Sequence, residues 1–325
     1  MPRSIGARRA SARVSAAGNV GAMDRLLVVA NAAAGGTHSA AVESAVAVLR
    51  TAADVEVADT EDVSDLVQVL AARDGRTVVV VGGDGSLHAV VAVLYERGWL
   101  DDTVVGLVPL GTGNDFARGA EIPLNPEEAA RSLVEASPRR VDLVLDDRDR
   151  VVVNAVHVGV GVDAAEEARA LKPRFGRFGY VLGAVRAGFR SPGRHLRIAV
   201  DGHVLANGRR YVLQVAVNNG RFVGGGTALA PDAVIDDGLA DVLVSFAVSR
   251  PRRMAYALRV RLGQHPRSQD VVQVRGRDVV VEARRPFRWN VDGELEGPAR
   301  RRGWRVQPGA WTMLLPAESP ETPGH

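Results

Sequence analysis

The fold can be inferred from residues 77–86, TVVVVGGDGS, in which an apolar run ends in three glycines within four positions. Five β-branched residues in succession, 77–81, are typical of a strand that is buried on both faces of a parallel sheet. The glycines permit positive φ angles and a close approach of the backbone to a ligand. The stretch therefore predicts a central strand, followed by a tight turn and the start of a helix.

Strand-like and helical segments alternate on both sides of this stretch. They follow one another in the order 26–30, 41–49, 55–58, 63–70, 77–81, 87–94 and 104–108, beginning with a strand. This alternation predicts a doubly wound α/β layer with parallel strands. We expect Ser86 to cap the helix that follows the glycines, so that the first N–H groups of this helix face the loop.

The sequence changes character near residues 137–140, and the remainder is rich in short β-type runs. These runs lie at 141–145, 151–156, 196–200, 211–217, 239–246, 271–274, 279–283 and 311–315, with one helical stretch at 164–189. We therefore predict an α/β nucleotide-binding domain at 24–138 and a mostly antiparallel β-sandwich domain at 139–316. The last strand could return to the first domain.

Composition excludes several kinds of chemistry. The chain of 325 residues has no cysteine, so disulfides, thiolate metal sites and a cysteine nucleophile are excluded. Lys172 is the only lysine, and the Gly-Lys-Ser/Thr sequence of a P-loop is absent. Phosphates would therefore be held by backbone N–H groups, arginines and metal. The basic excess comes from arginines near the start of the chain, and the near-neutral remainder argues against a nucleic-acid partner.

The two ends of the chain are expected to lie outside the domains. Residues 1–23 are rich in Ala, Ser and Arg and lack the apolar stretch of a signal peptide, so we expect a disordered leader or a true start at Met23. Residues 317–325 are polar and proline-rich and are expected to fray. No apolar run approaches the ~20 residues of a membrane span. Nothing in the sequence indicates an oligomeric state.

A second glycine loop, GTGND at 111–115, ends the strand-like run 104–108. Parallel strands place their carboxyl ends at one edge of a sheet, where α/β proteins bind ligands. Two loops of glycine and aspartate at this edge predict a nucleotide site, to which Thr112 and Asn114 offer a hydroxyl and an amide. Asp84, an acid within an anion-binding loop, indicates a metal ion nearby. The alternative for each loop is a tight turn with a solvated acid.

The order of the motifs resembles that of the diacylglycerol kinase catalytic family, which includes the sphingosine and ceramide kinases. The first loop is shared with NAD kinases and phosphofructokinases, but its pairing with 109–118, PLGTGNDFAR, is specific to the lipid branch. Further matches follow at 230–233, 236–239 and 291–294, so the resemblance covers about residues 26–316. The family implies two domains with the active site in the cleft between them, ATP and Mg²⁺, and a lipid hydroxyl as acceptor.

The resemblance also implies roles for individual residues. Those similar to the nucleotide site of the family are Asn31, Gly82, Gly83, Asp84, Gly85, Ser86, Gly111, Thr112, Gly113 and Asn114. The carboxylates similar to those that organise metal through water are Asp84, Asp115 and Asp142. Asp237, with the backbone carbonyls of Val234 and Leu239, is similar to a structural Mg²⁺ loop. Glu294 is similar to the catalytic base, a role that some relatives assign to the counterpart of Asp84.

The chemistry of Glu294 is consistent with this role. An alcohol is a weak nucleophile, and a carboxylate within hydrogen-bond reach helps by taking its proton. Asp292 and Glu294 flank Gly293, whose turn could direct Glu294 into the cleft, although a hairpin with a solvated acid is the alternative. Two departures from the family are Ser86 in place of the usual Thr and Ala32 in place of the usual Pro. The histidines lack metal-ligand spacing, and His88 in particular receives no role.

The helical stretch 164–189 predicts contact with a membrane. Basic side chains gather around apolar and aromatic ones in and just after it, namely Lys172, Arg174, Arg177, Arg186, Arg190, Arg194 and Arg197 around Phe175, Phe178, Tyr180, Val181 and Phe189. Such a face could rest on anionic headgroups, and an ordinary solvated face is the alternative. We thus expect an ATP- and Mg²⁺-dependent lipid kinase that is cytoplasmic and peripheral at the inner face of the cell membrane. The alternatives are an NAD kinase-like enzyme and a non-catalytic nucleotide sensor.

Overall fold

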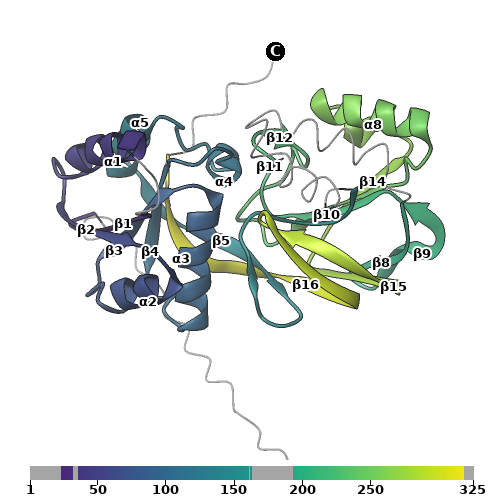
Figure 1. Cartoon of the computed structure of the whole chain (residues 1–325), viewed down its shortest axis with the longest axis horizontal. Helices are drawn as coiled ribbons and strands as arrows, with labels where there is room; N and C mark the ends of the chain where they lie inside the picture. The colour runs from purple at the N-terminus through teal and green to yellow at the C-terminus, as the bar shows by residue number, and fades with distance from the viewer. Residues whose placement is uncertain (1–22, 32–35, 161, 163–192, 318–325) are drawn as a thin grey trace, which may run out of the picture.

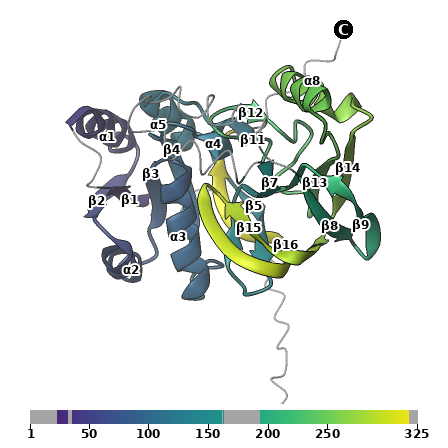
Figure 2. The ribbon, with the colours of Figure 1, turned by 45° about the vertical axis from the view of Figure 1, so that its right-hand side comes forward.

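The computed structural model describes residues 23–31, 36–160, 162 and 193–317, which Figure 1 shows as a ribbon. The leader up to residue 22, the tail from residue 318 and the predicted helical stretch at 164–189 lie outside the described residues. Two regions stand side by side, a strand layer flanked by helices and a region built mainly of β-strands. Figure 2 shows the same two regions turned by 45°.

The first region is a parallel sheet in the order β2-β1-β3-β4. Its strands are β1 (Arg25–Asn31), β2 (Asp54–Thr60), β3 (Thr77–Gly82) and β4 (Val104–Pro109). Its helices are α1 (Gly36–Leu49), α2 (Val63–Ala71), α3 (Asp84–Glu96), α4 (Asp115–Gly119) and α5 (Pro126–Val134). The predicted doubly wound layer is confirmed, with α1 packed beside α5 and α2 beside α3. The short helices α4 and α5 are additions to the predicted elements.

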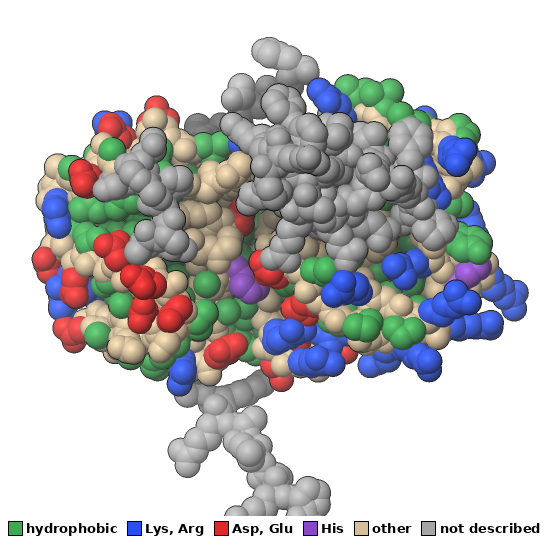
Figure 3. Space-filling view, in the orientation of Figure 1, with side chains coloured by type: hydrophobic (Ala, Val, Ile, Leu, Met, Phe, Trp, Pro, Cys, Tyr) green, Lys and Arg blue, Asp and Glu red, His purple; other side chains and the backbone are tan. Residues whose placement is uncertain are grey.

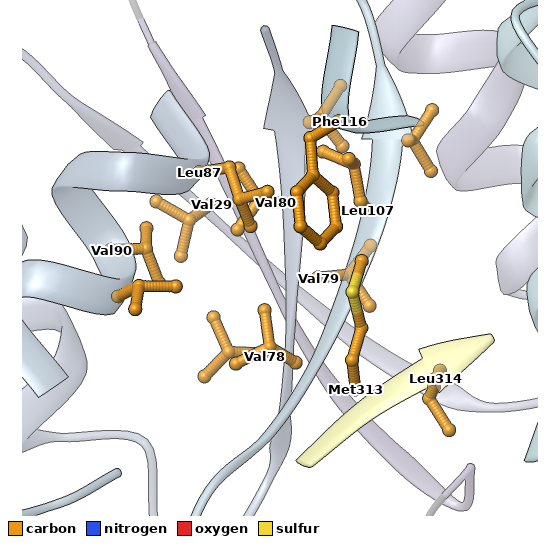
Figure 4. Close-up of a cluster of buried hydrophobic side chains, with 14 of the residues drawn as sticks. Val29, Val78, Val79, Val80, Leu87, Val90, Leu107, Phe116, Met313 and Leu314 are labelled. Carbon is orange, nitrogen blue, oxygen red and sulfur yellow. The ribbon is translucent and has the colours of Figure 1, made fainter. Parts of the chain in front are cut away.

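Strand β3 lies in the middle of this layer, between β1 and β4. The side chains of residues 78–81 are at most 2% exposed, so both faces of the strand are covered. Figure 4 shows Val79 and Val80 among side chains from α3, β4, α4 and the end of β16, including Leu87 and Met313. Burying each such side chain contributes about 1.5–3 kcal/mol, which explains why apolar residues occupy all four of these positions.

The second region is mainly antiparallel and confirms the predicted β-sandwich domain. Its strands are β5 (Ser137–Asp146), β6 (Val151–Val152), β7 (Ala155–Gly159), β8 (Arg194–Val200), β9 (His203–Val212), β10 (Gln214–Asn218), β13 (Ala240–Ser245), β14 (Val271–Gly276), β15 (Asp278–Val291) and β16 (Glu294–Leu315). A small hairpin of β11 (Phe222–Val223) and β12 (Thr227–Ala228), the helix α8 (Arg250–Arg261) and a 3-10 turn, η1 (His265–Arg267), complete it. Helix α8 occupies a segment for which no helix is predicted.

Strand β16 joins the two regions. It has 22 residues, pairs antiparallel with β15 and β5, and runs parallel to β4 at Thr312 and Met313. Register shifts in its pairing with β15 and β5 allow a strand of this length to bend. Its last residues, 310–315, contribute Trp311, Met313 and Leu314 to the core of the first region. The division into domains at residue 138 stays a prediction, because the last strand belongs to both hydrogen-bonded regions.

No helix in the described part of the chain combines the length and the apolar character that crossing a bilayer requires.

A buried ion pair lies where β5 meets β16. The side chains of Asp146 and Arg302 are each 2% exposed and are in direct contact. The N–H groups of Arg148 and Arg150 donate to Asp146 at 2.7 and 3.0 Å, and the Arg302 guanidinium lies over the ring of Trp289. Burial alone raises the pKa of Asp146, but these N–H groups and the arginine charges lower it overall.

Replacing Asp146 with Ala should lower the free energy of unfolding by about 3 kcal/mol, because a buried guanidinium loses a partner. This is the lower end of the roughly 3–5 kcal/mol that removal of one partner from a buried ion pair costs, since Asp147 still contacts Arg302. The control is Asp101→Ala, which removes an exposed pair with Arg140 and should change the free energy by only ~0–1 kcal/mol. Urea unfolding of both variants measures the difference, and equal effects would contradict a structural role for the buried pair.

Candidate active site

The two glycine loops end neighbouring strands and touch through their backbones. Gly82 lies opposite Pro109 in the parallel pairing of β3 and β4, and the N–H of Leu110 donates to the carbonyl of Gly82 at 2.8 Å. A Cβ atom added to Gly111 would lie 2.5 Å from the Cα of Gly83, closer than real Cβ contacts allow. The absence of a side chain at these two positions therefore lets the loops meet at the carboxyl edge of the sheet.

The polar side chains of the loops bind the loop backbone. Asn114 has a φ of 53°, and its amide accepts from the N–H and donates to the carbonyl of Gly111, both at 2.9 Å. Asp84 accepts hydrogen bonds from the N–H groups of Phe116 at 3.0 Å and Asp115 at 3.1 Å. The carboxylate from the start of α3 thus satisfies the first turn of α4, where a negative charge is favourable.

The prediction that Ser86 caps helix α3 is wrong. The cap position is held by Gly83, which makes no side-chain cap hydrogen bond, and the helix already begins at Asp84. Ser86 lies within the first turn, where its N–H donates to the carbonyl of Gly83 at 3.0 Å. A Cβ atom on Gly82 would lie 2.5 Å from the Ser86 hydroxyl oxygen, so this side chain turns back toward the strand end.

Asp115 fastens the first region to the second. It is 7% exposed, and its carboxylate accepts from the N–H of Gly225, at 2.9 Å, and of Gly226, at 2.7 Å. Burial raises the pKa of Asp115, the bond from Gly225 opposes the rise, and the charge of Asp84 adds to it. Residues 224–226, all glycine with positive φ, form the turn of the β11–β12 hairpin. This turn is absent from the predicted site, although three glycines in succession are a visible signal.

The turn that carries Glu294 is held by the residue two places before it. Asp292 and Gly293 connect β15 to β16 with φ angles of 46° and 99°, which both central positions of a type I′ hairpin turn require. The Asp292 side chain is 3% exposed and accepts hydrogen bonds from the backbone N–H groups of residues 153–155 at 2.7–2.9 Å. Glu294 itself is exposed.

His88 connects this turn to helix α3. Its Nδ1 lies 2.8 Å from a carboxylate oxygen of Asp292, and its side chain is 28% exposed. His88 follows Asp84 by four residues, so both lie on one face of α3. Burial alone lowers the pKa of His88, but the hydrogen bond and charge of Asp292, with the charges of Glu296 and Glu294, raise it overall. The sequence assigns His88 no role, and its only signal is the spacing from Asp84.

Of the carboxylates with predicted metal roles, Asp84 and Asp115 lie beside each other at the glycine loops, whereas Asp142 lies apart from them. Asp142 is 1% exposed and accepts from the N–H groups of Gly238 at 2.6 Å and Gly309 at 2.7 Å. Burial raises the pKa of Asp142 against the effect of these two bonds. Its carboxylate therefore holds the turn at 234–239 and the bend of β16, whereas Asp84 and Asp115 hold the glycine loops.

The predicted Mg²⁺ loop around Asp237 holds a guanidinium group. One carboxylate oxygen of Asp237 accepts from the N–H of Leu239 at 3.0 Å, and the other contacts Arg275. Val234, whose carbonyl completes the predicted set, is 37% exposed. Within the described residues, no three His, Cys, Asp or Glu side chains are grouped so that they could hold a metal ion. In this arrangement the Asp237 carboxylate contacts Arg275, and the Mg²⁺ site stays a prediction.

The other predicted nucleotide residues are positioned by the same strands. Asn31 is the last residue of β1, one strand away from the first loop. Gly85 and Thr112 are exposed, and a Cβ atom on Gly85 would meet nothing within 4 Å. Gly113 faces both regions, because a Cβ atom there would lie 3.1 Å from Asp84 and 3.8 Å from Gly225.

Two family descriptions together match most of the chain. Residues 25–145 match the diacylglycerol kinase catalytic domain, and residues 154–315 match the YegS C-terminal NAD kinase beta sandwich-like domain. The fold and the paired glycine loops thus define a phosphotransferase that uses an alcohol group as acceptor.

Individual relatives narrow this class. A protein of Stenotrophomonas maltophilia named "Probable lipid kinase YegS-like" is 33% identical over 253 residues, which cover 75% of this chain and 80% of the relative. Its namesake in Pseudomonas aeruginosa is 33% identical over 314 residues, covering 91% and 96%. The crystal structure of a diacylglycerol kinase from Bacillus anthracis shares the fold, with a TM-score of 0.71, 23% identity and coverage of 90% and 97%. The chain belongs to the YegS-like lipid kinases of the diacylglycerol kinase family.

Replacing Gly111 with Ala should force the loops apart and cost about 1–3 kcal/mol of stability, as overpacking does. The control is Gly85→Ala, for which a Cβ atom has free space and the fold should keep its full stability. Thermal unfolding of the two variants measures the contrast. A midpoint for Gly111→Ala equal to that of the control would show that the backbone contact is not a constraint.

The pair of His88 and Asp292 should make stability depend on pH. Since the pKa of His88 is raised above its ordinary value of 6.5, the stabilisation is complete below about pH 6.5 and is lost as pH rises through the raised pKa. The stability difference between the wild type and His88→Gln should therefore shrink from pH 6 to pH 8.5. Urea unfolding across this range provides the measurement, and a difference that grows with pH would contradict the assignment.

Proposed function

We propose that this chain transfers the γ-phosphate of ATP, in the presence of Mg²⁺, to the hydroxyl of diacylglycerol or a related lipid alcohol. The observation that carries the proposal is the meeting of three segments at helix α3. The first glycine loop lies at its N-terminus, the second loop touches the first, and the turn of Glu294 is tied one helical turn further along.

Phosphate binding is supported by the donors at the loops. The first N–H groups of α3 lie at the exposed end that begins with Asp84 and Gly85, and such groups bind anions without help from a lysine. Arg118 reaches across the seam between the regions, where its Nε donates to the carbonyl of Gly113 at 3.2 Å beside Gly226. Mg²⁺, when bound with the nucleotide, would neutralise phosphate charge during the transfer.

Glu294 is better placed than Asp84 to act as the base. Both carboxylate oxygens of Asp84 accept hydrogen bonds from the first turn of α4, so this group already has a structural task. On the hairpin between β15 and β16, Asp292 makes the buried hydrogen bonds, and Glu294 lies at the surface. Glu294 takes the proton of the acceptor hydroxyl while the oxygen of that hydroxyl bonds to the γ-phosphorus. The bond between the γ-phosphorus and the bridging β-phosphate oxygen breaks and releases ADP.

Replacing Glu294 with Gln should lower the phosphorylation rate by roughly 10²–10⁴-fold, because the acceptor hydroxyl loses its proton acceptor. Purified protein is incubated with γ-labelled ATP, Mg²⁺ and mixed micelles of diacylglycerol, monoacylglycerol, ceramide or sphingosine, with NAD in a parallel reaction. The matched control is Glu282→Gln, a carboxylate of the same hairpin that pairs with Arg197 and Arg301 on the surface.

The proposal is supported if a lipid is labelled by the wild type and the control while Glu294→Gln fails at unchanged thermal stability. Label in NAD alone would show that the acceptor is NAD and that the chain is an NAD kinase-like enzyme. Binding of ATP without label in any acceptor would indicate a nucleotide sensor and would overturn the catalytic role of Glu294.

A further inference from the structure

Helix α8 is attached to the β region by one face. Tyr256 is 6% exposed, and its hydroxyl group donates to the side-chain oxygen of Gln214 at 3.1 Å. Beside it, Arg252 pairs with Asp270 at 2.9 Å and Arg259 donates to the hydroxyl of Ser268 at 3.1 Å. These contacts fix the orientation of the helix, so that the opposite face is directed away from the protein.

The opposite face of α8 is apolar. Met254, Leu258 and, just after the helix, Leu262 are 50%, 58% and 57% exposed. Their spacing of four residues places them in one stripe along the helix, because each step of four turns by only ~40°. An attached helix normally exposes polar residues on its solvent face, so a stripe of three large apolar side chains indicates a surface that another body covers.

The charged side chains of helix α8 itself are all basic. Residues 250–261, RPRRMAYALRVR, contain five arginines and no acid. At ~100° per residue, Arg250 and Arg261 fall on one flank of the stripe, and Arg252 and Arg259 fall on the other. Figure 3 shows apolar side chains with basic neighbours at the surface where Figure 1 draws α8. An apolar stripe between two rows of arginines fits the acyl chains and anionic headgroups of a bilayer.

The position of α8 relative to the candidate site agrees with this partner. The helix packs against β12, and β11 of the same hairpin packs against α4, which begins at Asp115. Figures 1 and 2 both show α4, the hairpin and α8 along one side of the molecule. A bilayer that touches α8 would therefore lie on the side of the molecule where the glycine loops end.

We propose that α8 docks this protein on an anionic lipid bilayer, with Met254, Leu258 and Leu262 inserted at the level of the acyl chains and the flanking arginines at the phosphates. The proposal rests on the proposed function for its biological purpose, but vesicle binding can be measured without ATP or an acceptor. It assigns docking to a different segment of the sequence from the stretch at 164–189, which lies outside the described residues.

The first experiment uses the absence of cysteine from the chain. Leu258→Cys carries an environment-sensitive nitrobenzoxadiazole dye, and Val63→Cys on α2, a position that is 63% exposed, is the matched control. Vesicles of phosphatidylcholine with phosphatidylglycerol should shift the emission of the dye at 258 to shorter wavelength and leave the dye at 63 unchanged. Emission that is unchanged at 258, or shifted equally at both positions, would overturn the proposal. A shift at 258 that depends on protein concentration without vesicles would assign the stripe to a second copy and overturn it as well.

The second experiment separates docking from catalysis. The triple variant M254Q/L258Q/L262Q and the pair R250Q/R261Q should each bind the anionic vesicles at least about tenfold more weakly in co-sedimentation. The triple variant should phosphorylate diacylglycerol in vesicles at least about tenfold more slowly and dispersed dioctanoylglycerol at the wild-type rate. Equal loss on both acceptors would overturn the docking role. Vesicle binding by a wild type that phosphorylates neither acceptor would preserve the docking role and sink the proposed function.

Discussion

The contact between the backbones of Gly83 and Gly111 sets the geometry of the candidate site. Strands β3 and β4 are neighbours in one sheet, so the loops that leave them share a space too narrow for side chains. Hydrogen bonds to the backbone then hold the loops together. The Asp84 carboxylate accepts from the first turn of α4, and the Asn114 side chain accepts from the N–H of Gly111. Two helices are thereby fixed relative to each other at the sheet edge where α/β proteins bind ligands.

The aspartates around this edge act mainly on backbone N–H groups. Asp115 holds the glycine turn of the β11–β12 hairpin, Asp292 holds residues 153–155, and Asp142 holds Gly238 and Gly309. Each of these contacts joins segments that are far apart in the sequence, and the first two lie at the seam between the two regions. A carboxylate is suited to this task because it accepts several hydrogen bonds at once. The hydrogen bonds of Asp292 fix the hairpin on which Glu294 is exposed.

The parts of the fold that are periodic in sequence could be predicted, and the contacts that depend on tertiary structure could not. The valine run of β3 and both glycine loops are visible because each has a local physical cause in burial or backbone freedom. The sequence pattern places the cap of α3 at Ser86, but Gly83 holds this position, since a local pattern does not show where a helix begins within a glycine loop. The role of His88 depends on Asp292, which is 204 residues away. Helix α8 is not predicted from the sequence, because five arginines separate the few apolar residues of 250–261 and only Tyr256 of the helix is buried.

The pairing of β16 with β4 has a consequence for synthesis of the chain on the ribosome. Residues 310–315 fill the core of the first region, whereas the strands and helices around them come from the first half of the sequence. While the chain is growing, the edge of β4 stays unpaired and the apolar surface under Trp311 and Met313 stays open until the last strand is made. Such an edge can pair with other chains during that interval. The α/β layer therefore stays incomplete until residues 310–315 have been synthesised and pair with β4.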